Sequence, residues 1–135
     1  MARRIATVTL VVDDYDAALA FYCGKLGFAL IEDAPLGTGK RWVVVAPPGG
    51  QGARLLLARA QGERQQASIG NQTGGRVGFF LETEDFSRDF AAFTAAGVHF
   101  EEVPRHEPYG IVAVFEDPYG NRWDLIEPRG SSAGS

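Results

Sequence analysis

Hydrophobic and polar residues alternate with a period of two near the start of the chain, in "RIATVTLVV". Strict alternation over several residues, with many β-branched side chains, is typical of a strand that has two different faces. One predicted face holds Val8, Leu10 and Val12, and the other holds Thr7, Thr9 and Val11.

The period then changes from that of a strand to that of a helix. Apolar side chains recur at Tyr15, Leu19 and Tyr22, an aspartate at 13 or 14 is placed to cap the first turn, and Gly27 follows where a helix would stop. We predict a helix over about 14–26. Three short strands, 28–33, 41–48 and 53–60, follow between turn-rich segments, so the first half is β-α-β-β-β.

Residues 61–75 are polar, contain glycine and show no hydrophobic periodicity, which indicates a linker or mobile loop. The earlier pattern then returns, with a strand over 76–85 and a helix over 86–97 that places Phe86, Phe90 and Phe93 on one face. Three more strands are predicted at 98–104, 110–117 and 121–127, and "DPYGN" between the last two is a turn signal.

The two halves match position by position, which indicates an internal duplication. Asp14 corresponds to Asp85 and Tyr22 to Phe93, and both differences, 85 minus 14 and 93 minus 22, are 71. We predict an α+β fold with two βαβββ modules, at about 4–60 and 75–128, joined by a linker at about 61–74 in a single domain of residues 1–130. Because one helix covers one sheet face, we expect a curled mixed sheet around a shared cleft. Residues 129–135 are predicted to be a flexible tail.

Two segments resemble the vicinal oxygen chelate (VOC) superfamily, which includes glyoxalase I, bleomycin resistance proteins, fosfomycin resistance enzymes, methylmalonyl-CoA epimerase and extradiol dioxygenases. They are "TLVVDDYDAALAFYCGKLGF", similar to the family's strand followed by D-x-x-x-x-x-x-F-Y-x-x-x-L-G-F, and "FEDPYGNRWDLIE", similar to its D-P-x-G-x-x-x-[DE]-[LF] hairpin. The resemblance covers residues 4–128 and implies a glyoxalase/bleomycin resistance-like fold.

The resemblance also implies where a metal ion would bind. Metal-binding members hold one divalent ion with four ligands, usually His or Glu, from the first and last strands of each half. The corresponding positions here are Thr7, Leu56, Gly78 and Asp124. Leucine and glycine side chains have no donor atom and a neutral threonine hydroxyl is a weak ligand, so we expect no bound metal and no other cofactor.

Neither histidine compensates for the missing ligands. His99 is predicted at the start of a strand and His106 in the loop "PRHEPYG", away from the four ligand positions. A G-x-S-x-G motif is absent and the single cysteine, Cys23, lies in the first predicted helix, so no nucleophile can be assigned and the catalytic residues stay unknown. Acid–base chemistry by Asp124 or Glu82 is the remaining enzymatic possibility.

Strand alternation predicts which residues share a face with the four ligand positions. The opposite faces, Val8 among them, are expected to pack under the helices. Apolar walls, the ring of Phe80 and a few charges suit an aromatic or amphipathic small molecule, with room left at Gly78. In the alternative reading the charged residues only pair with one another across the halves. The predicted ligand-binding residues are Thr7, Thr9, Arg54, Leu56, Gly78, Phe80, Glu82, Arg122, Asp124 and Ile126, with Val11 and Ala58 beside them.

Charge and composition limit the classes of partner that we expect the protein to bind. The 13 basic and 17 acidic residues give a net charge of -4 without a basic run, which argues against nucleic acid, and no stretch is long enough to span a membrane. A single cysteine excludes an intrachain disulfide and suits a cytoplasmic protein.

The resemblance therefore leads to one main functional hypothesis. It is a metal-free VOC-family small-molecule binding protein, bleomycin resistance-like, that sequesters or senses an aromatic or amphipathic compound. The alternatives are a VOC-family enzyme, such as a glyoxalase-like lyase, an isomerase or a dioxygenase-like protein with an altered metal site, and a structural or protein-interaction module. The resemblance also implies a homodimer, in which a partner's "RHEPYG" completes the cleft.

Overall fold

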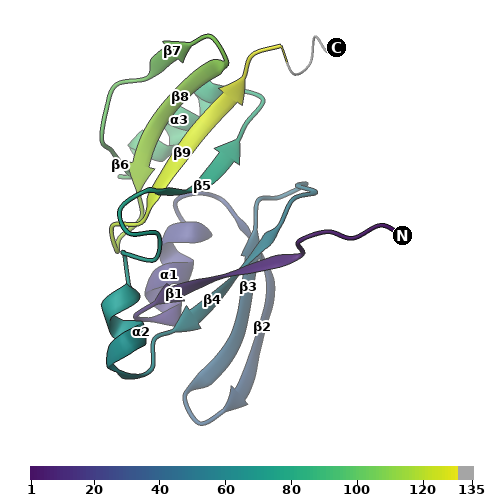
Figure 1. Cartoon of the computed structure of the whole chain (residues 1–135), viewed down its shortest axis with the longest axis vertical. Coiled ribbons are helices and arrows are strands. Elements are labelled where there is room, and N and C mark those ends of the chain that lie inside the picture. The colour runs from purple at the N-terminus through teal and green to yellow at the C-terminus, as the bar shows by residue number, and fades with distance from the viewer. Residues whose placement is uncertain (131–135) are drawn as a thin grey trace. The chain divides into compact units, whose positions relative to one another are not determined.

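The computed structural model of the chain describes residues 1–130 (Figure 1). The chain divides into two compact units, with the boundary between Gln72 and Thr73. Most of the tail predicted at 129–135 lies outside the described residues. In chain order the elements are β1 (Thr7–Val12), α1 (Tyr15–Tyr22), β2 (Ala29–Gly37), β3 (Lys40–Ala46), β4 (Arg54–Arg59), α2 (Gly62–Ser68), β5 (Val77–Glu82), α3 (Phe86–Ala95), β6 (His99–Phe100), β7 (Arg105–Glu107), β8 (Gly110–Glu116) and β9 (Arg122–Pro128).

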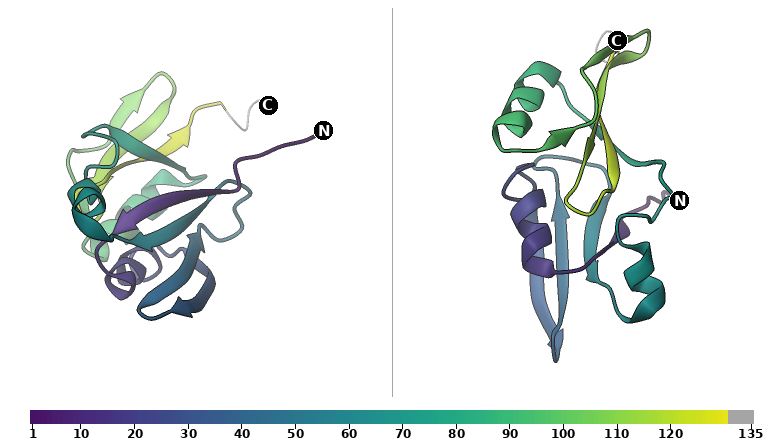
Figure 2. Two further views of the ribbon diagram at one scale, coloured as in Figure 1. Left: turned by 60° about the horizontal axis from the view of Figure 1, so that its bottom comes forward. Right: turned by 90° about the vertical axis from the view of Figure 1, so that its left-hand side faces the viewer.

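The first unit has one four-stranded sheet in the order β1-β4-β3-β2. Strand β1 runs parallel to β4, and the other neighbours are antiparallel. Helix α1 lies on one face of this sheet, as Figure 2 shows. The buried side chains between them are apolar, which explains why the period-two and helical patterns predicted this unit. They are Leu10, Val12, Val43, Val45, Leu55 and Leu57 from the sheet and Tyr15, Ala18, Phe21 and Tyr22 from the helix.

Helix α1 begins where the sequence predicted, but it ends earlier than predicted. The side chain of Asp14 accepts a hydrogen bond of 2.7 Å from the backbone N–H of Ala17, which makes Asp14 the N-cap. The helix ends at Tyr22, one turn before the predicted end, and the chain continues in turns to Gly27, whose φ of 75° favours glycine. Leu26 is still buried, because the turns keep it on the core side.

The second unit repeats this plan. Its sheet has the order β5-β9-β8-β6, with β7 also paired to β8, and α3 covers one face (Figure 2). The core between them is aromatic: the ring of Trp123 stacks on Phe79 with 4.5 Å between centroids and on Phe115 with 5.8 Å. Phe86 and Phe93 of α3 are buried as predicted, whereas Phe90 is half-buried and contacts Phe100. Two βαβββ modules in an α+β chain are therefore confirmed; the shared cleft stays a prediction.

The predicted turn before β9 is confirmed in detail. The backbone N–H of Gly120 donates to the carbonyl of Asp117 at 3.1 Å. The buried carboxylate of Asp117 accepts hydrogen bonds of 2.9 Å from the backbone N–H groups of Tyr119 and Asn121. This aspartate holds the turn by bonding the backbone two and four residues further on.

The predicted linker contains a short helix and contacts to β1, which the sequence pattern did not indicate. Residues 62–68 form α2, a short helix with no buried residue, so no apolar stripe marked it in the sequence. Gln72 then bonds to the edge strand β1: its side chain accepts from the N–H of Val11 at 2.9 Å and donates to the carbonyl of Thr9 at 2.7 Å.

The predicted strands at 28–33 and 98–104 differ in extent from the strands in the structure, and a predicted loop contains a further strand. The strand expected over 98–104 is only His99–Phe100, and the loop expected around His106 contains β7, which pairs His106 with Ile111 of β8. The turn-rich segment 34–40 likewise extends β2 as far as Gly37. In each case pairing with a neighbouring strand decides the conformation, and a local pattern cannot report that pairing.

No helix within residues 1–130 has the length and apolar character needed to cross a membrane.

Candidate functional site

The predicted site residues of the first unit lie on the sheet surface that faces away from the helix, which we call the far face. Thr7 pairs with Arg54 and Thr9 with Leu56 across the parallel β1–β4 ladder. Both threonines and Arg54 are exposed, and Leu56 is half-buried. The intervening residues Leu10 and Leu57 point into the core, as the alternation predicted, but Val8 on that side is 38% exposed.

The sequence analysis did not identify Trp42 on the same far face. Leu56 pairs with Val44 of β3, and Trp42 lies two residues before Val44 on the same side of the strand. The indole is 39% exposed, and its Nε1–H donates to the carboxylate of Glu32 at 3.1 Å. A tryptophan that is partly exposed to solvent, and whose N–H is already hydrogen-bonded, provides a flat apolar surface for a ligand.

In the second unit, the parallel β5–β9 ladder brings Phe80 and Asp124 together. Phe80 pairs with Asp124 and Glu82 with Ile126, all on the face away from α3. The neighbouring Trp123 and Leu125 are buried on the core side. Phe80 is 65% exposed, which is unusual for a side chain whose burial would favour folding.

Gly78 does not leave the room that the sequence analysis expected. The register of the β5–β9 ladder shifts between Val77 and Phe79, so Gly78 is the extra residue of a β-bulge. A Cβ atom at Gly78 would come within 2.8 Å of the Thr73 methyl carbon Cγ2. Thr73 is fixed there by a hydrogen bond of 2.6 Å from its hydroxyl to the carbonyl of Arg76. The space beside Gly78 is therefore taken by the Thr73 side chain.

Asp124 holds a carboxylate oxygen that lacks a hydrogen-bond donor. Its Oδ1 atom is buried and has no partner among the described residues, although the residue as a whole is half-buried. Burial raises the pKa of Asp124, since the ionised form loses hydration. Native proteins satisfy almost all buried polar atoms, so an unsatisfied one requires an explanation.

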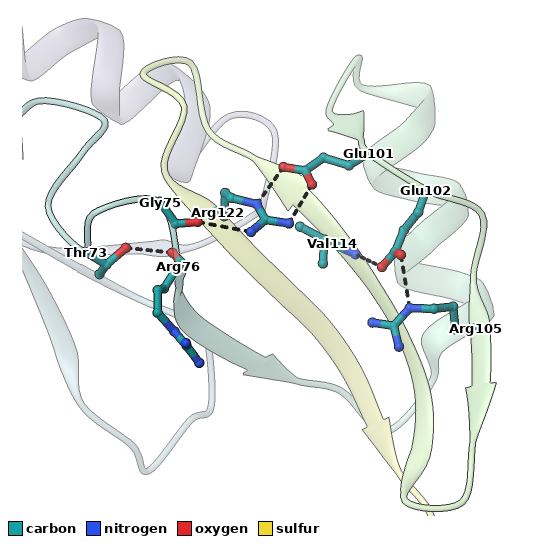
Figure 3. A network of polar contacts seen from close by, with 8 residues as sticks. All are labelled: Thr73, Gly75, Arg76, Glu101, Glu102, Arg105, Val114 and Arg122. Atoms are coloured by element: carbon teal, nitrogen blue, oxygen red, sulfur yellow. Dashed lines mark hydrogen bonds and ion pairs between the residues drawn. The ribbon is translucent and has the colours of Figure 1, made fainter.

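Arg122 is paired with a residue that the sequence analysis did not consider. Its Nε and Nη2 atoms donate to the two carboxylate oxygens of Glu101 at 2.9 and 2.8 Å, and Nη1 donates to the carbonyl of Gly75 at 3.1 Å (Figure 3). This bidentate geometry lowers the pKa of Glu101. The alternative reading, in which the charged residues of the predicted site pair with one another across the halves, therefore does not hold for Arg122, whose partner is Glu101.

Arg105, the second arginine near Asp124, also forms ion pairs with glutamates. Arg105 donates to Glu102 at 3.0 Å, and Glu102 in turn accepts from the backbone N–H of Val114 at 3.0 Å (Figure 3). Arg105 also donates to Glu107 at 2.5 Å. Val114 is the partner of Asp124 in β8, so this network adjoins the aspartate. The only sequence signal was the charge-rich "EEVPRHE", whose pairing depends on how β7 folds back on β8.

Comparison with known proteins defines the class of this chain. The family model of the Glyoxalase/Bleomycin resistance protein/Dioxygenase superfamily matches residues 4–125. An uncharacterized protein of Shewanella frigidimarina (strain NCIMB 400) is 52% identical over 128 residues, which cover 94% of this chain and 95% of that protein. The chain belongs to the glyoxalase/bleomycin resistance protein/dioxygenase superfamily, as the two sequence motifs predicted.

Solved structures with more than 25% identity share this fold. The crystal structure of UcmS2 is 31% identical, with a TM-score of 0.82 and coverage of 94% of this chain and 99% of that one. TnmS3, an antibiotic binding protein from Streptomyces sp. CB03234, is 30% identical, with a TM-score of 0.75 and coverage of 94% and 97%.

The residues at the metal-ligand positions of this superfamily do not fit a divalent ion. Leu56 offers no donor atom, and at Gly78 the nearest side chain is a threonine methyl group. Thr7 has a neutral hydroxyl, so Asp124 is the one carboxylate of the four. Among residues 1–130 no group of three or more His, Cys, Asp or Glu side chains is arranged to hold a metal. A transition ion needs several imidazole, thiolate or carboxylate ligands, which these positions do not supply.

Proposed function

We propose that this chain is a metal-free small-molecule binding protein of the bleomycin resistance type, which sequesters or senses an aromatic or amphipathic compound. The observation that carries the proposal is the pairing of Phe80, a largely exposed ring, with the half-buried carboxylate of Asp124 on one sheet face. An apolar surface with a few oriented polar groups is the usual composition of a small-molecule site.

Two further observations support the proposal. TnmS3, a similar protein over nearly its whole length, is an antibiotic binding protein. The donor set at the metal-ligand positions is also unsuited to the ion on which the metal-dependent members rely. Two of the four positions are apolar instead, with the Leu56 side chain at one and the Thr73 methyl group beside Gly78 at the other.

The same proposal includes the setting of the protein. We place it in the cytoplasm, because a single cysteine suits a reducing compartment, and we propose that it acts as a homodimer. The segment "RHEPYG", which we expect to reach a partner chain, forms β7 and the hairpin turn into β8, and presents Tyr109 with 55% of its surface exposed. Sedimentation at micromolar concentration tests this part, and a monomer would contradict it.

Binding is tested by NMR on the isotopically labelled protein. A library of planar aromatic and amphipathic compounds is titrated while backbone amide shifts are followed, and we expect saturable shifts in β5 and β9 for at least one compound. Phe80→Ala should weaken that binding about tenfold, because an aromatic contact supplies about 1 kcal/mol beyond its buried area. Val103→Ala is the control, since Val103 is an even more exposed apolar residue of the same unit, at 79% against 65% for Phe80. Absence of any saturable ligand, or equal affinity in Phe80→Ala, would contradict the proposal.

A metal-independent enzyme is the second candidate, and one observation favours it. The unpartnered carboxylate of Asp124 has a raised pKa, as general acids and bases in active sites often do. Elemental analysis of the purified protein separates both candidates from a metal enzyme. Stoichiometric divalent metal that is lost in Asp124→Ala would overturn the metal-free assignment. Chemical change of a bound ligand, abolished in Asp124→Asn, would favour the enzyme.

A further inference from the structure

The electrostatic surroundings of Asp124 differ from those of the other carboxylates in its network. Glu101 holds Arg122 through two hydrogen bonds, and Glu102 holds Arg105, with Glu107 as a second partner of that arginine. Figure 3 shows Arg122 of β9 beside Glu101 and Arg105 of β7 beside Glu102. Each arginine near Asp124 is thus already neutralised by a glutamate.

Within residues 1–130, Asp124 is consequently the carboxylate of this group that forms no ion pair with either arginine. Its Oδ1 atom is shielded from solvent and receives no hydrogen bond from any described residue. A carboxylate that has lost part of its hydration without gaining a donor is an unfavourable arrangement, unless a donor arrives from outside the chain. Because Asp124 as a whole is only half-buried, a group from outside meets the open part of the residue and contacts the shielded Oδ1 atom only once the side chain rotates.

The position of Phe80 limits what that group is attached to. Phe80 is the partner of Asp124 in the parallel β5–β9 ladder, and neighbouring strands lie about 5 Å apart, so the two side chains project side by side from the same face. A molecule that stacks on the exposed ring therefore reaches the carboxylate with a substituent one or two bonds long. Asp124 lies on β9, which is held in position by hydrogen-bonded strands on both sides, β5 and β8.

We propose that Asp124 is the specificity-determining residue of the site and selects aromatic ligands that carry a protonated amine on a short side chain. The inference rests on the proposed function and names its ligand class. A cationic donor suits this place better than a neutral one, because a charge-assisted hydrogen bond is roughly twice as strong and the neighbouring arginines are balanced. An anionic substituent is disfavoured by the same carboxylate.

The test uses three naphthalene probes that differ in one substituent: 2-naphthylmethylamine, 2-naphthylmethanol and 2-naphthoate. Affinities are measured by calorimetry at neutral pH for the wild-type chain, Asp124→Asn and Glu84→Gln. Glu84→Gln is the matched control, since it removes one exposed negative charge from the same unit outside the site. We expect the amine to bind the wild-type chain and Glu84→Gln about tenfold more tightly than the alcohol. In Asp124→Asn the two affinities should become equal, with alcohol binding unchanged.

The outcomes separate the inference from the function on which it rests. Equal binding of amine and alcohol by the wild-type chain would overturn the amine selectivity and leave aromatic binding intact. A preference that survives in Asp124→Asn, or that is lost equally in Glu84→Gln, would show that Asp124 is not its source. If none of the three probes binds and the NMR library also gives no ligand, the proposed function itself fails and the inference with it.

Discussion

Asp124→Asn should make the fold more stable at neutral pH. In the native chain the Oδ1 atom is buried without a donor, and burial raises the pKa of the carboxyl group. The substitution keeps the shape of the side chain and removes its charge. A buried polar group without a partner costs about 1–3 kcal/mol, and a charged one costs more. Since Asp124 is only half-buried, we expect a gain of about 1 kcal/mol, or a rise in Tm of roughly 4 °C for a chain of this size.

The dependence of this gain on pH follows from the direction of the pKa shift. An aspartate whose pKa is raised in the folded state binds more protons when folded than when unfolded, so its contribution to stability falls as the pH rises. The fall begins near the ordinary pKa of about 3.9 and is complete above the folded pKa. Asp124→Asn should therefore differ least from the wild type at acid pH and most at neutral pH.

Urea denaturation of both chains between about pH 4 and pH 8 measures this difference. Glu84→Gln is again the control, and as an exposed substitution it should change stability by less than about 0.5 kcal/mol. A loss of stability in Asp124→Asn at neutral pH, or a difference independent of pH, would refute the argument. It would mean that Asp124 has a stabilising partner in the native chain. A gain in stability together with a loss of amine selectivity is the result expected of a residue kept for binding.

Two further substitutions test the surroundings of the site. Gly78→Ala should destabilise the chain by roughly 1–3 kcal/mol, because the new Cβ would lie 2.8 Å from the Thr73 methyl carbon. Thr73→Ser removes that methyl group and keeps the hydroxyl that bonds Arg76, so most of the loss should be recovered in the double variant; additive losses in thermal unfolding would contradict this reading. Arg122→Gln should cost about 1 kcal/mol in dilute buffer and less at high salt, because the Glu101 pair is partly exposed. A cost unaffected by salt would indicate that packing, and not charge, dominates there.

The internal duplication and the alternation of strands could be predicted from the sequence. Both can be recognised from the spacing of residue types along the chain. In a strand, each side chain lies on the same face as the side chain two positions further on, whatever the rest of the chain does. For this reason Phe80 and Asp124 were correctly expected on one face, and a cap at residue 13 or 14 was predicted from residue type and spacing, of which the structure shows Asp14. Family membership was predicted from the two motifs "TLVVDDYDAALAFYCGKLGF" and "FEDPYGNRWDLIE".

The partners of the site residues were decided by tertiary structure alone. Arg122 pairs with Glu101, which lies 21 positions earlier in the chain, and Thr73 occupies the place beside Gly78 because a bulge shifts the register of β5 against β9. Such contacts depend on which strands become neighbours and at what offset, and that choice reflects the packing of the whole unit. The sequence by itself therefore determined that Phe80 and Asp124 share a sheet face, whereas only the folded chain showed that both arginines are already paired and that the Oδ1 atom of Asp124 has no donor among the described residues.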